Sequence, residues 1–300
     1  MFMGLVGSEM CIRDRFYTPA PYSRLVRDGE VLVVGVGGLG CLWALEAHSG
    51  CPDLAELLLV DADESSFEGA SYANCLFLDS GGEGRGAAAL PSMAIHRLMD
   101  GMESISDLLE RAEVVILMAG LGGGMGSGAS GELAKMAKQY GSLVLSVVGL
   151  PFAEQPLRCA IAEEALPSLE AHSDVCIRVS MERLAWQSRR RKTNWMLGSG
   201  WIGELVEGLV TTLASVGRIN LDLMDMRAII NKTGNATLIV GTGSSENPSS
   251  VVEMARNSPL NDVSIEGAKG CMIQVEGGPD MTLSHLTELT DSFVSQMDPD

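Results

Sequence analysis

The chain is poor in positive charge and in aromatic residues. It has 21 Lys and Arg residues against 39 Asp and Glu residues, and its formal net charge is −18 at pH 7. Such a surface repels nucleic acid and anionic lipid. The only basic run, Arg189–Lys192, is typical of a solvated helix face. We therefore predict that the protein binds no nucleic acid.

Long apolar runs and closely spaced cysteines are also missing. No apolar run reaches the roughly 18 residues that a membrane span needs, so we expect no direct membrane insertion. The seven cysteines include no C-x-x-C pair, which argues against a zinc site or a disulfide framework. This cysteine usage predicts a reducing compartment, and we expect a cytoplasmic protein.

The first 15 residues show no periodicity that relates them to the rest of the chain. The apolar opening is short and is soon interrupted by Glu9, unlike a signal peptide. We interpret residues 1–15 as a non-native leader and leave them out of the fold prediction.

From Val31 onward, strand-like runs alternate with helix-like segments. The strand-like runs are Val31–Val34, Leu57–Val60, Val114–Met118, Leu143–Val148 and Val175–Val179. Strands without polar alternation, separated by helices, are typical of a parallel sheet covered on both faces. We predict an α/β nucleotide-binding domain with a parallel sheet over residues 16–187.

The remaining third predicts a helix and a smaller domain. Apolar residues recur at helical spacing between Trp195 and Leu213, which predicts a central helix within a connecting region, residues 188–216. Residues 217–300 are predicted to form an α+β domain, with few strands to close its sheet, so we expect this domain to be truncated. Its expected strands and helices are Ala236–Val240, Cys271–Val275, Ser249–Arg256 and Leu283–Val294.

Two glycine-rich loops follow predicted strands. The first, Gly35–Gly40, matches G-x-G-x-x-G, and Asp61 ends the next strand about 20 residues later. Glycines of this kind let backbone amides approach a phosphate at a helix N-terminus, although the same pattern also makes a tight strand-to-helix turn. Val31–Gly40, followed by Leu58–Asp63, resembles the opening of ubiquitin-activating-like adenylating enzymes. Asn74 is present, but a partner arginine and paired zinc cysteines are not.

The second loop, Gly120–Ala129, is more informative. It contains six glycines in the nine residues from Gly120 to Gly128. Packing alone rarely explains so many glycines, because each one costs conformational entropy. Backbone amides in such a loop form an anion-binding concavity at a helix N-terminus. Two such loops on neighbouring strands predict binding of a di- or triphosphate.

Gly122–Gly128 reads GGGMGSG and is similar to the GGGTGTG signature of the FtsZ/tubulin superfamily. The likeness runs almost collinearly from Val31 to about Phe293. Gly84–Pro91 resembles the family segment that approaches the γ-phosphate, and Pro151 resembles the start of the ribose loop. The resemblance implies GTP or GDP as ligand, with Mg²⁺ held through the phosphates. The nucleotide-binding residues that it implies are Gly35, Gly37, Gly38, Gly40, Asp61, Asp63, Ala87, Ala88, Gly120, Gly122, Gly123, Gly124, Met125, Gly126, Ser127, Gly128, Pro151, Glu154, Arg158, Met181, Trp195 and Ser199.

Asn220–Arg227 resembles the N-x-D-x-x-D-x-R loop that family members insert into the nucleotide site of the next subunit. The resemblance therefore implies that Asn220, Asp222 and Asp225 act in catalysis in trans. The residues agree with that role. Two nearby carboxylates would repel a triphosphate bound in their own subunit, but they can orient water beside a triphosphate of the next subunit whose charge is neutralised by Mg²⁺. Without the resemblance, the two aspartates would equally suit a helix N-terminus.

Several positions depart from the family pattern. Met125 replaces a threonine at the phosphates, Met181 and Ser199 replace asparagines at the base, and Leu90 replaces the asparagine before Pro91. Trp195 keeps an aromatic ring that can stack on the base. With these departures, the chain resembles a divergent, archaeal-type member of the family. The changes at the base put specificity for guanine in question.

The resemblance implies a cytoskeletal GTPase that polymerises head to tail and hydrolyses GTP between subunits, in cell division or cell shape. It also implies a C-terminal tail for a membrane adaptor. Two alternatives stay open from the residues alone. One is an ATP-dependent adenylating enzyme, and the other is a nucleotide-binding scaffold without hydrolysis.

Overall fold

A computed structural model describes residues 2–6, 30–78, 90–192, 194, 196, 200–214, 223–230, 240–241, 247–256, 271–276 and 281–295. The chain divides into a larger unit, residues 26–211, and a smaller unit of residues 1–25 and 212–300. The predicted domain boundaries stay predictions, and each unit is described by itself.

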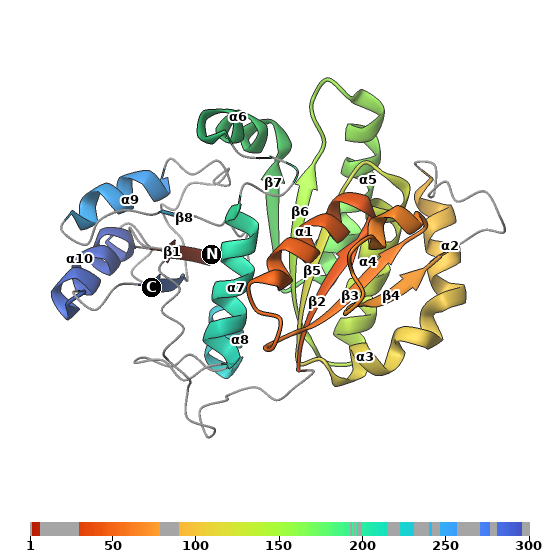
Figure 1. The fold of residues 1–300 in the computed structure, drawn as a ribbon, viewed down its shortest axis with the longest axis horizontal. Coiled ribbons are helices and arrows are strands. Elements are labelled where there is room, and N and C mark those ends of the chain that lie inside the picture. The colour runs from red at the N-terminus through yellow and green to blue at the C-terminus, as the bar shows by residue number, and fades with distance from the viewer. Residues whose placement is uncertain are drawn as a thin grey trace. The chain divides into compact units, whose positions relative to one another are not determined.

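The larger unit is built on one parallel sheet with the strand order β4-β3-β2-β5-β6-β7 (Figure 1). The strands are β2 (Val31–Val36), β3 (Glu56–Asp61), β4 (Asn74–Phe77), β5 (Val114–Gly120), β6 (Leu143–Leu150) and β7 (Val175–Ser180). Every residue of β2 is buried, as expected for a central strand covered on both faces. The α/β prediction with a parallel sheet is confirmed.

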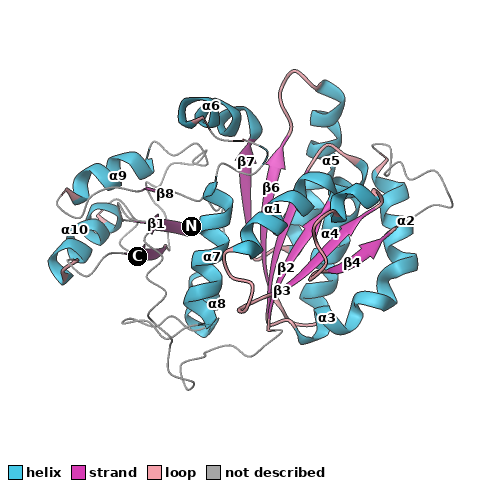
Figure 2. Ribbon diagram, in the orientation of Figure 1, coloured by secondary structure: helices cyan, strands magenta, loops and turns pink. Residues whose placement is uncertain are grey.

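Helices cover both faces of this sheet (Figure 2). They are α1 (Gly37–Ser49), η1 (Glu64–Phe67), α2 (Pro91–Gly101), η2 (Met102–Ile105), α3 (Ser106–Arg111), α4 (Gly124–Gln139), α5 (Pro156–His172), α6 (Met181–Arg191) and α7 (Trp201–Ala214). Helix α1 packs on β2, β3 and β5. Alternate strand residues such as Val34, Leu117 and Val148 share one core with α2, α4 and α5.

The five predicted strands of this unit match β2, β3, β5, β6 and β7 closely. The sequence pattern did not predict β4, because this edge strand buries only Leu76 among its four residues. The predicted central helix corresponds to α7, which begins at Trp201; its expected start, Trp195, lies outside the described residues.

The smaller unit contains a three-stranded sheet with the order β8-β1-β9. Its elements are β1 (Phe2–Val6), α8 (Leu223–Ile230), β8 (Val240–Gly241), α9 (Pro248–Arg256), β9 (Met272–Glu276) and α10 (Leu283–Val294). Helices α9 and α10 form a core around Val252, Ala255 and Phe293, against which Ile273 and Val275 of β9 pack.

Phe2–Val6 form the middle strand of this sheet and run parallel to β8 and β9. Backbone groups of β8 and β9 pair with β1, whose short apolar run is long enough for a strand. The interpretation of residues 1–15 as a non-native leader stays a prediction.

Candidate functional site

The two glycine loops lie at the carboxyl ends of adjacent strands. β2 pairs with β5 in the register Gly35 to Met118 and Val36 to Ala119, so both strands end at the same edge. A Cβ placed on Gly37 would lie 3.1 Å from the amide nitrogen of Gly126. The two loops therefore touch and form one continuous surface.

Both loops open helices whose first amides donate no hydrogen bond to an N-cap side chain. The N-cap of α1 is Val36, and the N-cap of α4 is Gly123. The first amides of a helix have no partner within the helix and carry positive potential from the helix dipole. Two neighbouring helix starts of this kind are suited to an anion with several charges.

Glycine is required in the first loop by close backbone contacts. A Cβ on Gly40 would lie 2.3 Å from the carbonyl oxygen of Met118, and a Cβ on Gly35 would lie 2.7 Å from that of Gly40. Gly37 has φ of +71°, a conformation that favours glycine. Gly38 is exposed, and no atom lies closer than 3.8 Å to the position of its missing Cβ. The backbone at Gly38 is therefore open to a ligand.

In the second loop, packing explains more of the glycines than the sequence suggested. A Cβ on Gly126 would lie 2.1 Å from the Gly120 carbonyl oxygen, and one on Gly128 would lie 2.2 Å from the Pro91 carbonyl oxygen. Gly122 has φ of +93° and faces the backbone of Arg158. By contrast, no atom lies within 4 Å of the Cβ position of Gly123. Gly123 is thus the part of this loop that stays open.

Ser127 and Met125 hold the second loop from inside. Ser127 Oγ accepts a 2.8 Å hydrogen bond from the Gly122 amide, and Ser127 is 6% exposed. Met125 is 4% exposed and belongs to the hydrophobic core with Leu121 and Ala129. The methionine side chain therefore anchors the loop in the core, where a threonine hydroxyl would lack a polar environment.

The acidic residues after β3 lie beside the first loop. Asp61 is buried, and its carboxylate accepts hydrogen bonds from Ala62 N at 2.7 Å and from Ser66 Oγ at 2.5 Å. Burial raises the pKa of Asp61, although these hydrogen bonds lower it in part. Asp63 caps η1 by accepting from Ser65 N and Ser65 Oγ. Ser66 was not among the predicted site residues, since no motif marks it.

The other side of the loops is formed by residues after β6 and β7. Leu121 N donates to Gly149 O at 2.9 Å, which ties the second loop to the end of β6. Pro151 follows β6, and the Glu154 and Arg158 side chains are exposed. Met181 begins α6, is 4% exposed, and its Sδ lies 2.9 Å from the Cβ position of Gly149. Glu182, which the sequence did not single out, orders this segment by accepting from Ala153 N at 2.8 Å.

Some predicted site residues cannot be placed. Ala87, Ala88, Trp195, Ser199, Asn220 and Asp222 lie outside the described residues. Asp225 lies in α8, but its side chain is outside the described part. Their roles stay predictions. Among the residues that the structure describes, no group of three or more His, Cys, Asp or Glu could hold a metal ion. No described helix is long and apolar enough to cross a membrane.

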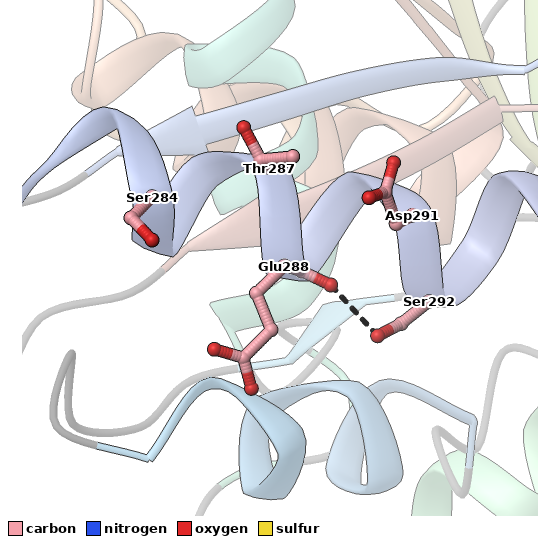
Figure 3. A pocket seen from close by; sticks show the side chains of 5 residues that line it. All are labelled: Ser284, Thr287, Glu288, Asp291 and Ser292. Carbon is pink, nitrogen blue, oxygen red and sulfur yellow. Dashed lines mark hydrogen bonds between the residues drawn. The ribbon is translucent and has the colours of Figure 1, made fainter.

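A separate hollow on the smaller unit is lined by Ser284, Thr287, Glu288, Asp291 and Ser292, all from α10 (Figure 3). Glu288 already interacts with Ser249 Oγ of α9 at 3.3 Å, and its backbone oxygen accepts from Ser292 Oγ. Thr287 and Glu288 point in different directions in Figure 3, so these groups do not converge on one ligand. The glycine loops are therefore the candidate site.

Fold and site together define the class: an α/β protein with two adjoining glycine loops, each opening a helix, at the carboxyl edge of a parallel sheet. Residues 30–187 match the Tubulin/FtsZ family, GTPase domain, and residues 234–300 match the FtsZ family, C-terminal domain. The chain therefore belongs to the Tubulin/FtsZ family.

Individual relatives agree with this assignment. Cell division protein FtsZ 2 of Halobacterium salinarum is 31% identical over 288 residues, covering 90% of this chain and 70% of that protein. Cell division protein FtsZ 1 of Archaeoglobus fulgidus is 30% identical over 275 residues, with 90% and 75% covered. The structure of an FtsZ dimer from M. jannaschii has a TM-score of 0.76 at 28% identity and covers 90% of this chain and 80% of that chain. The chain is thus a divergent member with archaeal relatives.

Proposed function

We propose that the protein is a cytoskeletal GTPase of cell division that hydrolyses GTP between subunits stacked head to tail. The observation that carries the proposal is the contact between the loop of α1 and the loop of α4, within residues that match a GTPase domain. Two uncapped helix starts side by side fit a chain of phosphates better than a single phosphate.

The open backbones at Gly38 and Gly123 are the expected phosphate contacts, while Gly40, Gly126 and Gly128 allow the helices to approach the strands. Ser127 Oγ accepts a hydrogen bond from the Gly122 amide, so the hydroxyl proton of Ser127 can be donated to a phosphate oxygen. Both Asp61 oxygens and the Asp63 Oδ1 already accept hydrogen bonds, so Mg²⁺ would be held mainly through the phosphates. That ion would neutralise charge on the phosphates during hydrolysis.

Recognition of the base follows from residues after β6 and β7 and in the connecting region. The Met181 side chain offers the base no hydrogen-bond donor and only a weak acceptor, its thioether sulfur. We expect Trp195 to stack on the base and Ser199 to supply the remaining polar contact. Glu154, just before α5, and Arg158, in its first turn, are exposed and can reach the sugar.

Catalysis would be completed by Asn220, Asp222 and Asp225 of the adjacent subunit. Self-association is supported by the match to a protein whose structure is an FtsZ dimer. A head-to-tail contact does not close on itself and so generates a filament. Asp222 and Asp225 would orient the attacking water beside the γ-phosphate, so hydrolysis would depend on assembly.

The alternatives have less support. An adenylating enzyme would account for the first glycine loop but not for the match of residues 234–300 to an FtsZ domain. A scaffold without hydrolysis is not favoured, because the loop around Met125 is intact and well packed. We further propose a cytoplasmic location, and attachment to a membrane through an adaptor stays a prediction.

The test is the release of phosphate from GTP and ATP with Mg²⁺ over a range of protein concentrations. We expect selective GTP hydrolysis whose specific activity rises steeply above a threshold concentration. Asp222→Ala should lower turnover by about a hundredfold or more while leaving GTP affinity within about twofold, since the residue acts in trans.

Activity with ATP that does not depend on concentration would contradict the assembly mechanism and favour the adenylating alternative. GTP binding without turnover at any concentration would instead favour the scaffold.

A further inference from the structure

The end of β3 places an acid against the first phosphate loop. Asp61 is only 4% exposed, and the Cβ position of Gly38 lies 4.0 Å from its Oδ2. Ser66 Oγ lies 3.8 Å from the same point. A negative carboxylate near the start of α1 competes with an anionic ligand for the same positive potential. Anion binding at the start of α1 therefore depends on which donors form hydrogen bonds to the Asp61 carboxylate.

Donors that follow β3 in the chain hold the Asp61 carboxylate: the backbone amides of Ala62 and Asp63 and the hydroxyl of Ser66. Ala62 N donates to Oδ1 at 2.7 Å, and Ser66 Oγ donates to Oδ2 at 2.5 Å. Hydrogen bonds to a charged acceptor are shorter and stronger than those between neutral groups. Because Oδ2 is satisfied by Ser66, the carboxylate does not need the amides in the first turn of α1, which no side chain caps.

Two titratable groups act on Asp61 from the elements around it. Cys41 of α1 lies close enough to interact with Asp61, and burial raises the pKa of its thiol, so the thiol stays neutral. Asp63 adds a second negative charge after β3. Asp63 is in turn held by Ser65 N and Ser65 Oγ. The two serines of η1 thus hold one acid each, and only Ser66 holds the acid that borders Gly38.

We propose that Ser66 is a positioning residue of the nucleotide site: it holds the Asp61 carboxylate off the α1 amides and so leaves them free for phosphate. The proposal rests on the proposed function, because it requires a nucleotide phosphate at the start of α1. Without the Ser66 hydroxyl, the carboxylate takes its hydrogen bond from the first turn of α1, as an N-cap aspartate does, and the loop closes on itself.

Equilibrium titration with GTP tests this proposal on the unchanged chain, Ser66→Ala, Ser66→Thr, Asp61→Asn and the double variant Asp61→Asn/Ser66→Ala, beside a control at Ser65. We expect Ser66→Ala to weaken GTP binding about tenfold and Ser66→Thr to restore it, because threonine keeps the donor. In the Asp61→Asn background, where the competing charge is gone, Ser66→Ala should change affinity by less than about twofold. Ser65→Ala is the matched control, since its hydroxyl holds Asp63 and not Asp61: any change that it makes in GTP affinity should be the same in the unchanged chain and in the Asp61→Asn background.

The pH profile separates positioning from a structural role. Because burial raises the pKa of Asp61, a falling pH protonates the carboxylate and removes its competition. GTP affinity of Ser66→Ala should therefore recover toward that of the unchanged chain as pH falls, and the double variant should show no such recovery. A loss of the same size at every pH would mean that Ser66 only supports the fold.

If Ser66→Ala weakens GTP binding equally in the unchanged chain and in the Asp61→Asn background, the positioning role is overturned and the proposed GTPase is untouched. A folded, unchanged chain that binds neither GTP nor GDP would overturn both. The two failures are distinguished by the titration of the unchanged chain alone.

Discussion

The two glycine loops begin their helices at the same edge of the sheet, yet different interactions hold them. The loop of α4 is supported from within, by Ser127 bonded to Gly122 and by Met125 in the core. Among the described contacts, the loop of α1 has only a weaker thiol contact of this kind, from Cys41 Sγ to the Gly35 carbonyl oxygen at 3.5 Å, and it borders the buried acid Asp61. Loops with similar glycine patterns can therefore be stabilised differently. The α4 loop is held by its own side chains, whereas the electrostatics of the α1 loop depend on an acid of the neighbouring strand β3.

The largest effect is expected where a glycine meets backbone. Gly126→Ala places a Cβ 2.1 Å from the Gly120 carbonyl oxygen, so strand and helix must separate. We expect a loss of about 3 kcal/mol or more in the free energy of unfolding, measured in urea. Gly123→Ala is the matched control, because nothing lies within 4 Å of its Cβ, and it should change stability by less than about 1 kcal/mol. Equal losses in both variants would contradict the division into packed and open glycines.

The core anchor of the second loop is tested by restoring the family residue. Met125→Thr shortens a buried side chain and introduces a hydroxyl into the core. We expect it to lower the free energy of unfolding by about 2 kcal/mol and to bring no gain in GTP hydrolysis. Met99→Thr on α2, where the side chain is 56% exposed, should cost well under about 1 kcal/mol. A gain in hydrolysis without loss of stability would show instead that residue 125 faces the phosphates.

The smallest effect concerns the acid beside the first loop. The raised pKa of Asp61 means that folding favours its protonated form. Protonation of Asp61 therefore contributes favourably to the free energy of unfolding below the ordinary pKa of 3.8. This contribution is lost as pH rises through the raised pKa of the folded state. Asp61→Asn should gain stability relative to the unchanged chain as pH increases over that window, in urea unfolding curves recorded from about pH 4 to pH 8. A difference that stays constant with pH would contradict the burial of a charged carboxylate.

Much of the larger unit could be predicted from the sequence. Five strands were located because uninterrupted runs such as Val31–Val34 and Val114–Met118 suit only a sheet buried on both faces. Both glycine loops were found because closely spaced glycines cost conformational entropy and are usually present only where the backbone needs a special conformation or a close approach. Edge strand β4 was not found, since three of its four residues are exposed and the apolar signal disappears.

The candidate site was predicted less completely, because its contacts join residues distant in sequence. Gly128 is required by Pro91, Gly122 by Arg158 and Gly40 by Met118. No local sequence pattern predicts which distant residue each of these glycines contacts. Ser66 and Glu182 were missed for the same reason, since a single polar residue acquires its role only from the strand end or loop that it reaches.

By itself, the sequence determined the α/β class, five of the six strands of the larger sheet, and the two loops suited to phosphate. Those features follow from local periodicity and composition, which act within one element. Only the tertiary structure decided which glycines are packed and which are open, that Met125 belongs to the core, and that β1 lies between β8 and β9. These outcomes depend on steric exclusion and backbone pairing between separate segments, and such contacts exist only once the chain has folded.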